Sequence, residues 1–337
     1  MRPFAYQRAG SAEMAVSLAG SSATALTLAP VQFLAGGTTL LDLMKTGAMA
    51  PRRLVDINDL ADAHGRIEAT PGGLRIGALV RMADAAADPT IRRDYPVIAQ
   101  TLELAASQQL RNMASLGGNV LQRTRCRYFR DPSWPSCNKR APGSGCGALA
   151  GVNRLHAVLG VSDACIASYP GDFGQALAAL DAAVEIVGPN GARVIPFTDL
   201  HRAPGATPHI ETGLQSGELI VGFRVPAGPW TRRSLYVKVR DRASYEFALA
   251  SAAVALEVAD GIARTVRIAL GGVATRPWRA RAAEIALTGR PIDEETAWAA
   301  ADAAFAGAVT HGGNDFKPEL GRRTLVRALI EAARMEV

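Results

Sequence analysis

Residues 115–172 organise this chain, and they read SLGGNVLQRTRCRYFRDPSWPSCNKRAPGSGCGALAGVNRLHAVLGVSDACIASYPGD. The stretch opens with a Gly-Gly-Asn turn, closes with Pro-Gly-Asp, and contains every cysteine of the protein: Cys126, Cys137, Cys146 and Cys165. Because the rest of the chain lacks cysteine, we interpret this concentration as a metal-binding insertion within a ligand-binding domain.

The spacing of the cysteines leaves three kinds of cross-link open. Proline and glycine are dense between them, so we expect a loop, and a loop this long needs a function or a cross-link. Two disulfides would require an oxidising compartment. Zinc sites usually contain closely spaced cysteine pairs, which are missing because 10, 8 and 18 residues separate successive cysteines. An iron–sulfur cluster also takes four thiolates and tolerates wider spacings.

Length and composition indicate a globular protein of two or three domains. The chain has 337 residues, of which 48% are hydrophobic and 20% charged. It contains no run of about 18 apolar residues, so we expect no membrane-spanning helix. Residues 1–20 lack a charged segment followed by an apolar one, and we therefore expect no export signal.

The net charge is +6, and basic residues gather around Cys126. A nucleic-acid-binding surface combines basic and aromatic side chains on one element. Only one segment does so, and weakly, through Arg123, Arg125, Arg127, Arg130, Tyr128 and Phe129. A solvated or partner-facing surface explains the same residues, as does compensation of an anionic thiolate-ligated cluster. We predict no binding to nucleic acid.

The first 120 residues contain two glycine turns. In the first, an apolar strand at 31–34 enters Ala35-Gly36-Gly37-Thr38-Thr39, and a helix starts at Leu40. Backbone N–H groups in such a turn, with a helix N-terminus, suit a phosphate or pyrophosphate, although an ordinary strand-turn-helix corner has the same sequence. The second turn spans 114–120. Together they are typical of two walls of a nucleotide site, and two unrelated turns remain the alternative.

Periodicity predicts mixed helix and strand around these turns. We expect helices at 11–19 and 90–113 and strands at 55–57 and 74–80, then after the insertion a helix capped by Asp172, strands at 183–187 and 218–223, a linker at 226–229, strands at 233–240 and 266–270, and helices at 292–306 and 319–335. His201 and His209 have no spaced partner, so we assign them surface or structural roles. No catalytic residue stands out.

Three motifs in this order resemble one family. They are Phe33-Leu-Ala-Gly-Gly-Thr-Thr-Leu-Leu-Asp-Leu-Met44, Gln109-Leu-Arg-Asn-Met-Ala-Ser-Leu-Gly-Gly-Asn119 and Lys238-Val-Arg-Asp-Arg-Ala-Ser-Tyr-Glu-Phe-Ala-Leu249. The chain resembles the FAD-binding medium subunit of the xanthine dehydrogenase (molybdenum hydroxylase) family over nearly its whole length. Its insertion resembles that of the FAD subunits of bacterial periplasmic aldehyde oxidoreductases, which carry a [4Fe-4S] cluster.

The resemblance implies an α+β fold: a two-subdomain FAD-binding domain of the vanillyl-alcohol-oxidase/PCMH type, followed by an α+β domain of the CO dehydrogenase flavoprotein type. The expected segments are 1–60, then 61–226 with the insertion at about 122–168, then 230–337. The implied FAD contacts are Gln32, Phe33, Leu34, Ala35, Gly36, Gly37, Thr38, Thr39, Leu40, Ser115, Leu116, Gly117, Gly118, Asn119, Asp172, Ile220 and Lys238. Thr39 departs from the Asn common in close relatives. The implied ligands of the cluster are the four cysteines.

The resemblance also implies an electron-transfer role. A large partner subunit with a molybdenum cofactor would oxidise an aldehyde, and a small [2Fe-2S] subunit would pass the electrons to this FAD, with Lys238 favouring the reduced flavin by charge. The complex would be cytoplasmic, or periplasmic through a partner's signal. Alternatives are the flavin subunit of a hydroxybenzoyl-CoA reductase or xanthine dehydrogenase-like complex, a self-sufficient flavoenzyme, and a zinc-stapled interaction protein.

Overall fold

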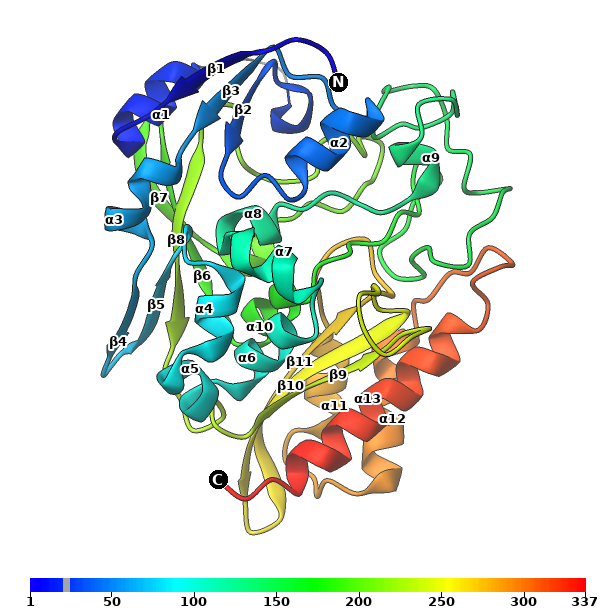
Figure 1. Ribbon diagram of the computed structural model, residues 1–337. Coiled ribbons are helices and arrows are strands. Elements are labelled where there is room, and N and C mark those ends of the chain that lie inside the picture. The colour runs from blue at the N-terminus through cyan, green and yellow to red at the C-terminus, as the bar shows by residue number, and fades with distance from the viewer. Residues whose placement is uncertain (21–24) are drawn as a thin grey trace.

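The computed structural model describes residues 1–20 and 25–337. Its strands form three sheets, and its helices pack against these sheets (Figure 1). This mixture of helix and sheet confirms the predicted α+β class. Within the described residues, no helix is both long and apolar enough to cross a lipid bilayer.

The first sheet is small and parallel, with strand order β1-β3-β2. Its elements are β1 (Ala5–Arg8), α1 (Ala12–Ala19), a 3-10 turn (Leu26–Leu28), β2 (Val31–Leu34), α2 (Leu40–Thr46) and β3 (Arg53–Asp56). Ser11 caps α1 as predicted, because its hydroxyl accepts a hydrogen bond from the Met14 backbone N–H at 3.1 Å. The predicted strand at 31–34 is also confirmed.

The second sheet is antiparallel, with strand order β4-β5-β8-β6-β7. Its strands are β4 (Ile67–Thr70), β5 (Gly73–Gly77), β6 (Ala183–Gly188), β7 (Gly191–Pro196) and β8 (Leu219–Pro226). The accompanying helical elements are a 3-10 turn (Asn58–Leu60), α3 (Ala61–His64), α4 (Met82–Ala87), α5 (Pro89–Asp94), α6 (Pro96–Glu103), α7 (Gln108–Met113), α8 (Leu116–Val120), α10 (Phe173–Ala179) and a 3-10 turn (Phe197–Asp199).

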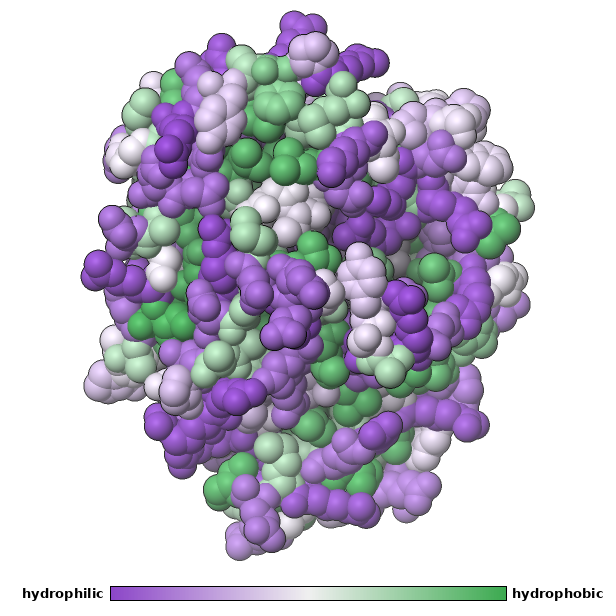
Figure 2. All heavy atoms as spheres, in the orientation of Figure 1, coloured by the Kyte–Doolittle hydropathy of each residue, from purple (hydrophilic) through white to green (hydrophobic). Residues whose placement is uncertain are grey.

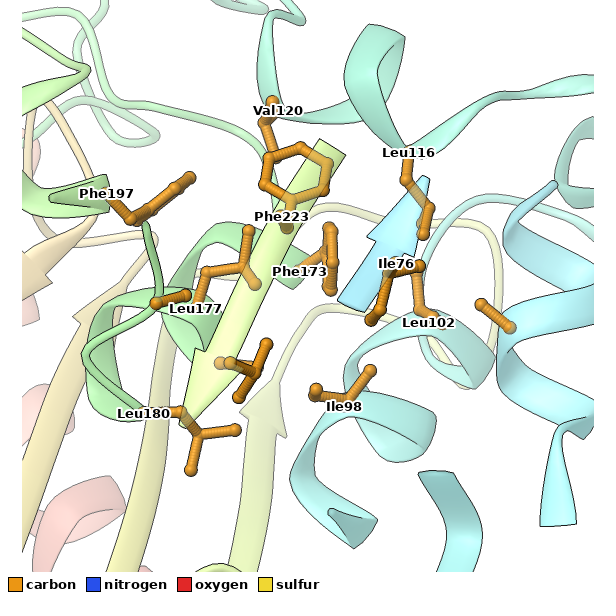
Figure 3. Packing of buried hydrophobic residues seen from close by; sticks show 14 of the residues in the cluster. Ile76, Ile98, Leu102, Leu116, Val120, Phe173, Leu177, Leu180, Phe197 and Phe223 are labelled. Carbon is orange, nitrogen blue, oxygen red and sulfur yellow. The ribbon is translucent and has the colours of Figure 1, made fainter. Parts of the chain in front are cut away.

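The main hydrophobic core lies between this sheet and its helices (Figure 3). Phe223 of β8 and Phe173 of α10 meet edge to face, with ring centres 5.8 Å apart. Leu116 of α8 points into the same core and is fully buried. The core therefore fixes α8 and α10, the two helices on either side of the cysteine insertion.

The third sheet is antiparallel, with order β12-β11-β10-β9. It comprises β9 (Ser234–Val239), β10 (Ala250–Ala259), β11 (Ile262–Gly271) and β12 (Trp278–Arg279), and it packs with α11 (Arg281–Leu287), α12 (Glu294–Phe305) and α13 (Lys317–Ala333). A second hydrophobic core fills the space between sheet and helices. The boundaries predicted for the three segments remain predictions.

Several predicted elements differ from the structure. The helix expected at 90–113 is divided among α5, α6 and α7, because Pro96 and Ser107 each start a new helix. The second glycine turn is the one-turn helix α8, which the Ser115 hydroxyl caps. β1, β7 and α11 were not predicted. The insertion is mostly loop, as expected, with one helical turn, α9 (Arg127–Arg130).

Candidate functional site: two adjoining pockets

The first glycine loop lines a large pocket, which we call the glycine-loop pocket. Its volume is about 1160 Å³ including the part open to solvent, and it is mainly apolar. All of residues 32–40 line it, together with Ser115, Gly117, Gly118 and Ile220. On the face drawn in Figure 2 polar residues predominate, and one of the small hydrophobic patches lies near the top, over the β2–α2 region. Thirteen of the predicted contact residues are thus brought together.

The two glycine loops touch each other at Gly36. A side-chain Cβ at this position would lie 1.9 Å from the backbone oxygen of Met113, which directly precedes the second wall. Gly37 has a φ of 72°, a conformation that glycine adopts without strain. Glycine is therefore required at both positions, one for the close approach and one for the turn.

A side-chain clamp joins the same two walls. Arg81 donates to the backbone oxygen of Met113 at 2.6 Å and to the Asn58 side-chain oxygen at 3.0 Å. Asn58 in turn donates to the backbone oxygen of Ala35 at 3.1 Å and to Asp56 at 2.7 Å. The spacing between the walls is thus set by hydrogen bonds as well as by the glycine contact.

Four predicted contact residues lie outside the lining of this pocket. Because α8 is helical, Leu116 points into the core, and the Asn119 amide donates to the Met82 sulfur at 3.3 Å. Asp172 and Lys238 form a buried ion pair at 2.7 Å. The sequence analysis named none of the remaining lining residues as FAD contacts: Thr27, Leu43, Met49, Ile57, Ala78, Leu79, Leu121, Arg123, Glu211, Thr212, Glu218 and Leu219.

The Asp172–Lys238 pair belongs to a closed network. The Asp172 carboxylate also accepts a hydrogen bond from the Tyr236 hydroxyl at 2.5 Å, and Lys238 also donates to the backbone oxygen of Leu104 at 3.0 Å. Burial raises the pKa of Asp172, against the opposing effect of Lys238. Asp172 starts α10 as predicted but does not cap it with its side chain. Lys238 was predicted to favour the reduced flavin by its positive charge. In the structure that charge is already paired with the Asp172 carboxylate.

A largely buried carboxylate lines the glycine-loop pocket. Glu211 accepts hydrogen bonds from Arg123 at 2.8 Å and pairs with Lys139 at 3.3 Å. Burial alone would raise its pKa, but the two cations lower the pKa of Glu211 to about 2. Glu218 is paired with Arg193 at 2.7 Å. Neither acid therefore presents an uncompensated negative charge to an anionic ligand.

All four cysteines line a second, smaller pocket of about 270 Å³, which we call the cysteine pocket. They are free thiols, and Cys137 and Cys146 face each other across an isolated β-bridge. Burial raises the pKa of Cys126 to about 12 and that of Cys165 to about 11. Neither thiol ionises near neutral pH unless a bound cation stabilises the thiolate.

The geometry bears on the three cross-links that the spacing left open. In the described part of the chain the cysteines form no disulfide. Across residues 1–20 and 25–337, no three His, Cys, Asp or Glu side chains converge as they would around a single metal ion. Four thiolates can hold zinc as well as an iron–sulfur cluster, so the arrangement leaves both of these alternatives open.

The arginines near Cys126 tie the insertion to α2. Arg125 and Arg130 bind the Asp42 carboxylate at 3.0 and 2.8 Å. Arg140 donates to the backbone oxygens of Tyr128 and Phe129 at 2.6 and 2.8 Å. Arg125 and Arg130 are therefore engaged within the protein, whereas Arg127 is exposed.

Comparisons with known proteins agree with this arrangement. Residues 2–228 match the FAD binding domain in molybdopterin dehydrogenase, and residues 235–332 match the CO dehydrogenase flavoprotein C-terminal domain. The chain is 49% identical to the aldehyde oxidoreductase FAD-binding subunit PaoB of Escherichia coli K12, over 98% of this chain and 99% of PaoB. It is 26% identical to the carbon monoxide dehydrogenase medium chain of Hydrogenophaga pseudoflava, over 97% and 96% of the two chains.

Solved structures show the same fold. A Cu,Mo-CO dehydrogenase superimposes with a TM-score of 0.75 and 26% identity, covering 99% of both chains. Quinoline 2-oxidoreductase from Pseudomonas putida 86 superimposes with a TM-score of 0.73 and 25% identity, covering 99% of this chain and 98% of the other. The chain therefore belongs to the family of FAD-binding medium subunits of molybdopterin dehydrogenases, which are oxidoreductases of the molybdenum hydroxylase type.

Proposed function

We propose that this chain is the FAD- and [4Fe-4S]-binding electron-transfer subunit of a molybdenum-dependent aldehyde oxidoreductase. The observation that carries the proposal is the pairing of two adjoining pockets, one walled by the glycine loops and one lined by all four cysteines. The 49% identity to an aldehyde oxidoreductase FAD-binding subunit supports the substrate class.

The glycine-loop pocket fits FAD on three grounds. The close approach at Gly36 leaves backbone rather than side chain at the wall, the lining is mainly apolar, and both lining acids are paired. We propose direct contact for the lining residues among those predicted, namely Gln32, Phe33, Leu34, Ala35, Gly36, Gly37, Thr38, Thr39, Leu40, Ser115, Gly117, Gly118 and Ile220. Leu116, Asn119, Asp172 and Lys238 remain predictions from the resemblance.

The cysteine pocket fits an iron–sulfur cluster by the chemistry of its donors. Cys126, Cys137, Cys146 and Cys165 would supply the four thiolates. Lys139 lines the same pocket, and its charge lowers the pKa of Cys165 against the larger effect of burial. A thiolate-ligated cluster is anionic, so a cation at this wall favours it.

The chemistry that FAD supplies when bound is the acceptance of electrons and their transfer to a terminal acceptor. The role of this chain is to hold and orient the cofactors, and no acid–base residue is proposed. A small [2Fe-2S] subunit and a large subunit with a molybdenum cofactor are the proposed partners. Location in the cytoplasm, or in the periplasm through a partner's export signal, is part of the proposal.

The test is anaerobic reduction of the assembled complex by candidate substrates. Aldehyde is expected to bleach the flavin absorbance of the complex but not of the isolated chain. Bleaching by xanthine or by a hydroxybenzoyl thioester, with none by aldehyde, would move the chain to the alternative complexes. Bleaching of the isolated chain by a small alcohol or an aldehyde would instead indicate a self-sufficient flavoenzyme.

A further inference from the structure

A buried histidine contacts one of the four cysteines. The Nε2 atom of His156 lies 3.2 Å from the Cys126 sulfur, and the residue is only 5% exposed. His156 lies after Cys146 in the sequence and is 30 residues away from Cys126, the residue that it contacts. No motif in the sequence marked it.

The backbone around His156 is held from two sides. Its N–H donates to the backbone oxygen of Asn153 at 2.9 Å, and the next residue, Ala157, donates to Ile166 at 2.9 Å. The Asn314 amide, in the loop before α13, donates to the backbone oxygen of Ala157 at 3.0 Å. These hydrogen bonds hold the backbone at residues 156 and 157 and so fix the position of the imidazole beside Cys126.

The state of the ring determines what it can offer to sulfur. A neutral imidazole carries one N–H, which either ring nitrogen can hold. Beside a thiol, Nε2 can donate or accept. Once the sulfur is a thiolate bound to iron it has no proton to give, and the contact remains a hydrogen bond only if Nε2 carries the hydrogen. The buried Nδ1 atom, which has no partner among the described residues, is then the unprotonated nitrogen.

We infer that His156 is a positioning residue that donates its Nε2–H to the Cys126 sulfur and raises the reduction potential of the cluster. This inference rests on the proposed function, because it needs a cluster in the cysteine pocket. Hydrogen bonds to cluster sulfurs stabilise the added negative charge of the reduced state, so they favour reduction. The four cysteines then differ: Cys126 accepts a side-chain N–H, and Cys165 accepts the backbone N–H of Ala167 at 3.4 Å.

The experiment is a redox titration of the cluster, followed by electron paramagnetic resonance, in the anaerobically purified holoprotein. The informative pair is His156→Gln and His156→Asn. The longer Gln amide can place an N–H where Nε2 lies, whereas the shorter Asn amide cannot reach it. We expect a more negative midpoint potential for His156→Asn and for His156→Leu, and a potential close to the wild type for His156→Gln. His64→Leu, in α3, is the control outside the insertion.

Iron and acid-labile sulfide are measured on every sample. A loaded His156→Asn protein with the wild-type potential would overturn the inference while leaving the cluster proposal intact. Wild-type protein without iron would overturn both. If His156→Leu fails to load, the Gln and Asn pair still decides, because equal potentials in the two loaded variants contradict the inferred hydrogen bond.

Discussion

The guanidinium carbon of Arg123 lies 4.4 Å from the centre of the Phe129 ring. Arg123 lines the glycine-loop pocket and Phe129 lines the cysteine pocket, so one stacked pair of buried side chains spans the wall between them. The same guanidinium binds Glu211 at 2.8 Å. A change in this wall is therefore expected to affect both pockets, and their proximity gives the two proposed cofactors a shared structural support.

Replacing Arg123 by methionine should destabilise the protein. The substitution leaves the largely buried Glu211 carboxylate with Lys139 as its remaining cation, so the expected loss is smaller than the roughly 3–5 kcal/mol that an uncompensated buried charge costs. Chemical denaturation should show this loss, with weaker FAD retention. Arg93→Met is the matched control, because Arg93 pairs with Asp94 at the surface, where such pairs contribute about 0–1 kcal/mol. Equal losses in both variants would contradict the account.

Gly36→Ala should abolish or strongly weaken FAD binding. The added Cβ would meet the Met113 backbone oxygen at 1.9 Å, so one glycine loop must move away from the other. Gly307→Ala is the control, since a Cβ there meets nothing within 4 Å. FAD affinity measured by flavin fluorescence should fall at least about 10-fold in the first variant, equivalent to about 1.4 kcal/mol. Normal affinity in a folded Gly36→Ala protein would show that the loop contact does not shape the site.

Lys238→Met should cost more stability than the double variant Lys238→Met/Asp172→Asn. The single change leaves the Asp172 carboxylate buried without its cation, with an expected loss of about 3–5 kcal/mol. The second change removes the stranded charge and should restore part of the loss. Urea unfolding of wild type, both single variants and the double variant measures the coupling. Additive losses would mean that the two side chains do not interact in solution.

His201 should make stability depend on pH in mildly acidic solution. Burial lowers the pKa of His201 to about 4, from an ordinary value of 6.5, and its Nε2–H donates to the backbone oxygen of Val120 at 2.9 Å. Between these two pH values the unfolded chain binds a proton that the folded chain does not. Stability therefore falls as pH drops from 6.5 to 4, by up to about 3 kcal/mol for this group.

His201→Gln is the variant that isolates this effect, because an amide can keep the hydrogen bond to Val120 and does not titrate. The free energy of unfolding should then depend less on pH between 6.5 and 4 than it does in the wild type. His156, which has a similarly lowered pKa, contributes equally to both proteins and cancels in the comparison. Identical pH profiles would rule out His201 as a contributor.

Local sequence signals predicted the elements that depend on local chemistry. Ser11 caps α1 because its hydroxyl reaches a backbone N–H three residues on, and the strand at 31–34 ends where Gly36 and Gly37 follow. The four cysteines were expected to act together because they lie in one loop, and the structure places them around one pocket. Each of these inferences needed only residues from one continuous segment of the chain.

Contacts between distant residues could not be predicted in the same way. Arg123 meets Glu211 across 88 residues, and neither lies in a recognisable motif. The Gly117-Gly118 pair suggests a turn, yet the Ser115 cap and the burial of Leu116 favour a helical turn. β7 is an exposed strand at the edge of the sheet, so its sequence lacks the apolar alternation of a half-buried strand.

The most direct test of the central claim is the content of FAD, iron and acid-labile sulfide in anaerobically purified protein, measured beside a variant with all four cysteines replaced by serine. We expect about one FAD, four irons and four sulfides per wild-type chain, and loss of iron and sulfide in the variant. FAD together with zinc, or with no metal, would contradict the cluster. Absence of FAD after reconstitution would contradict the function proposed for the glycine-loop pocket.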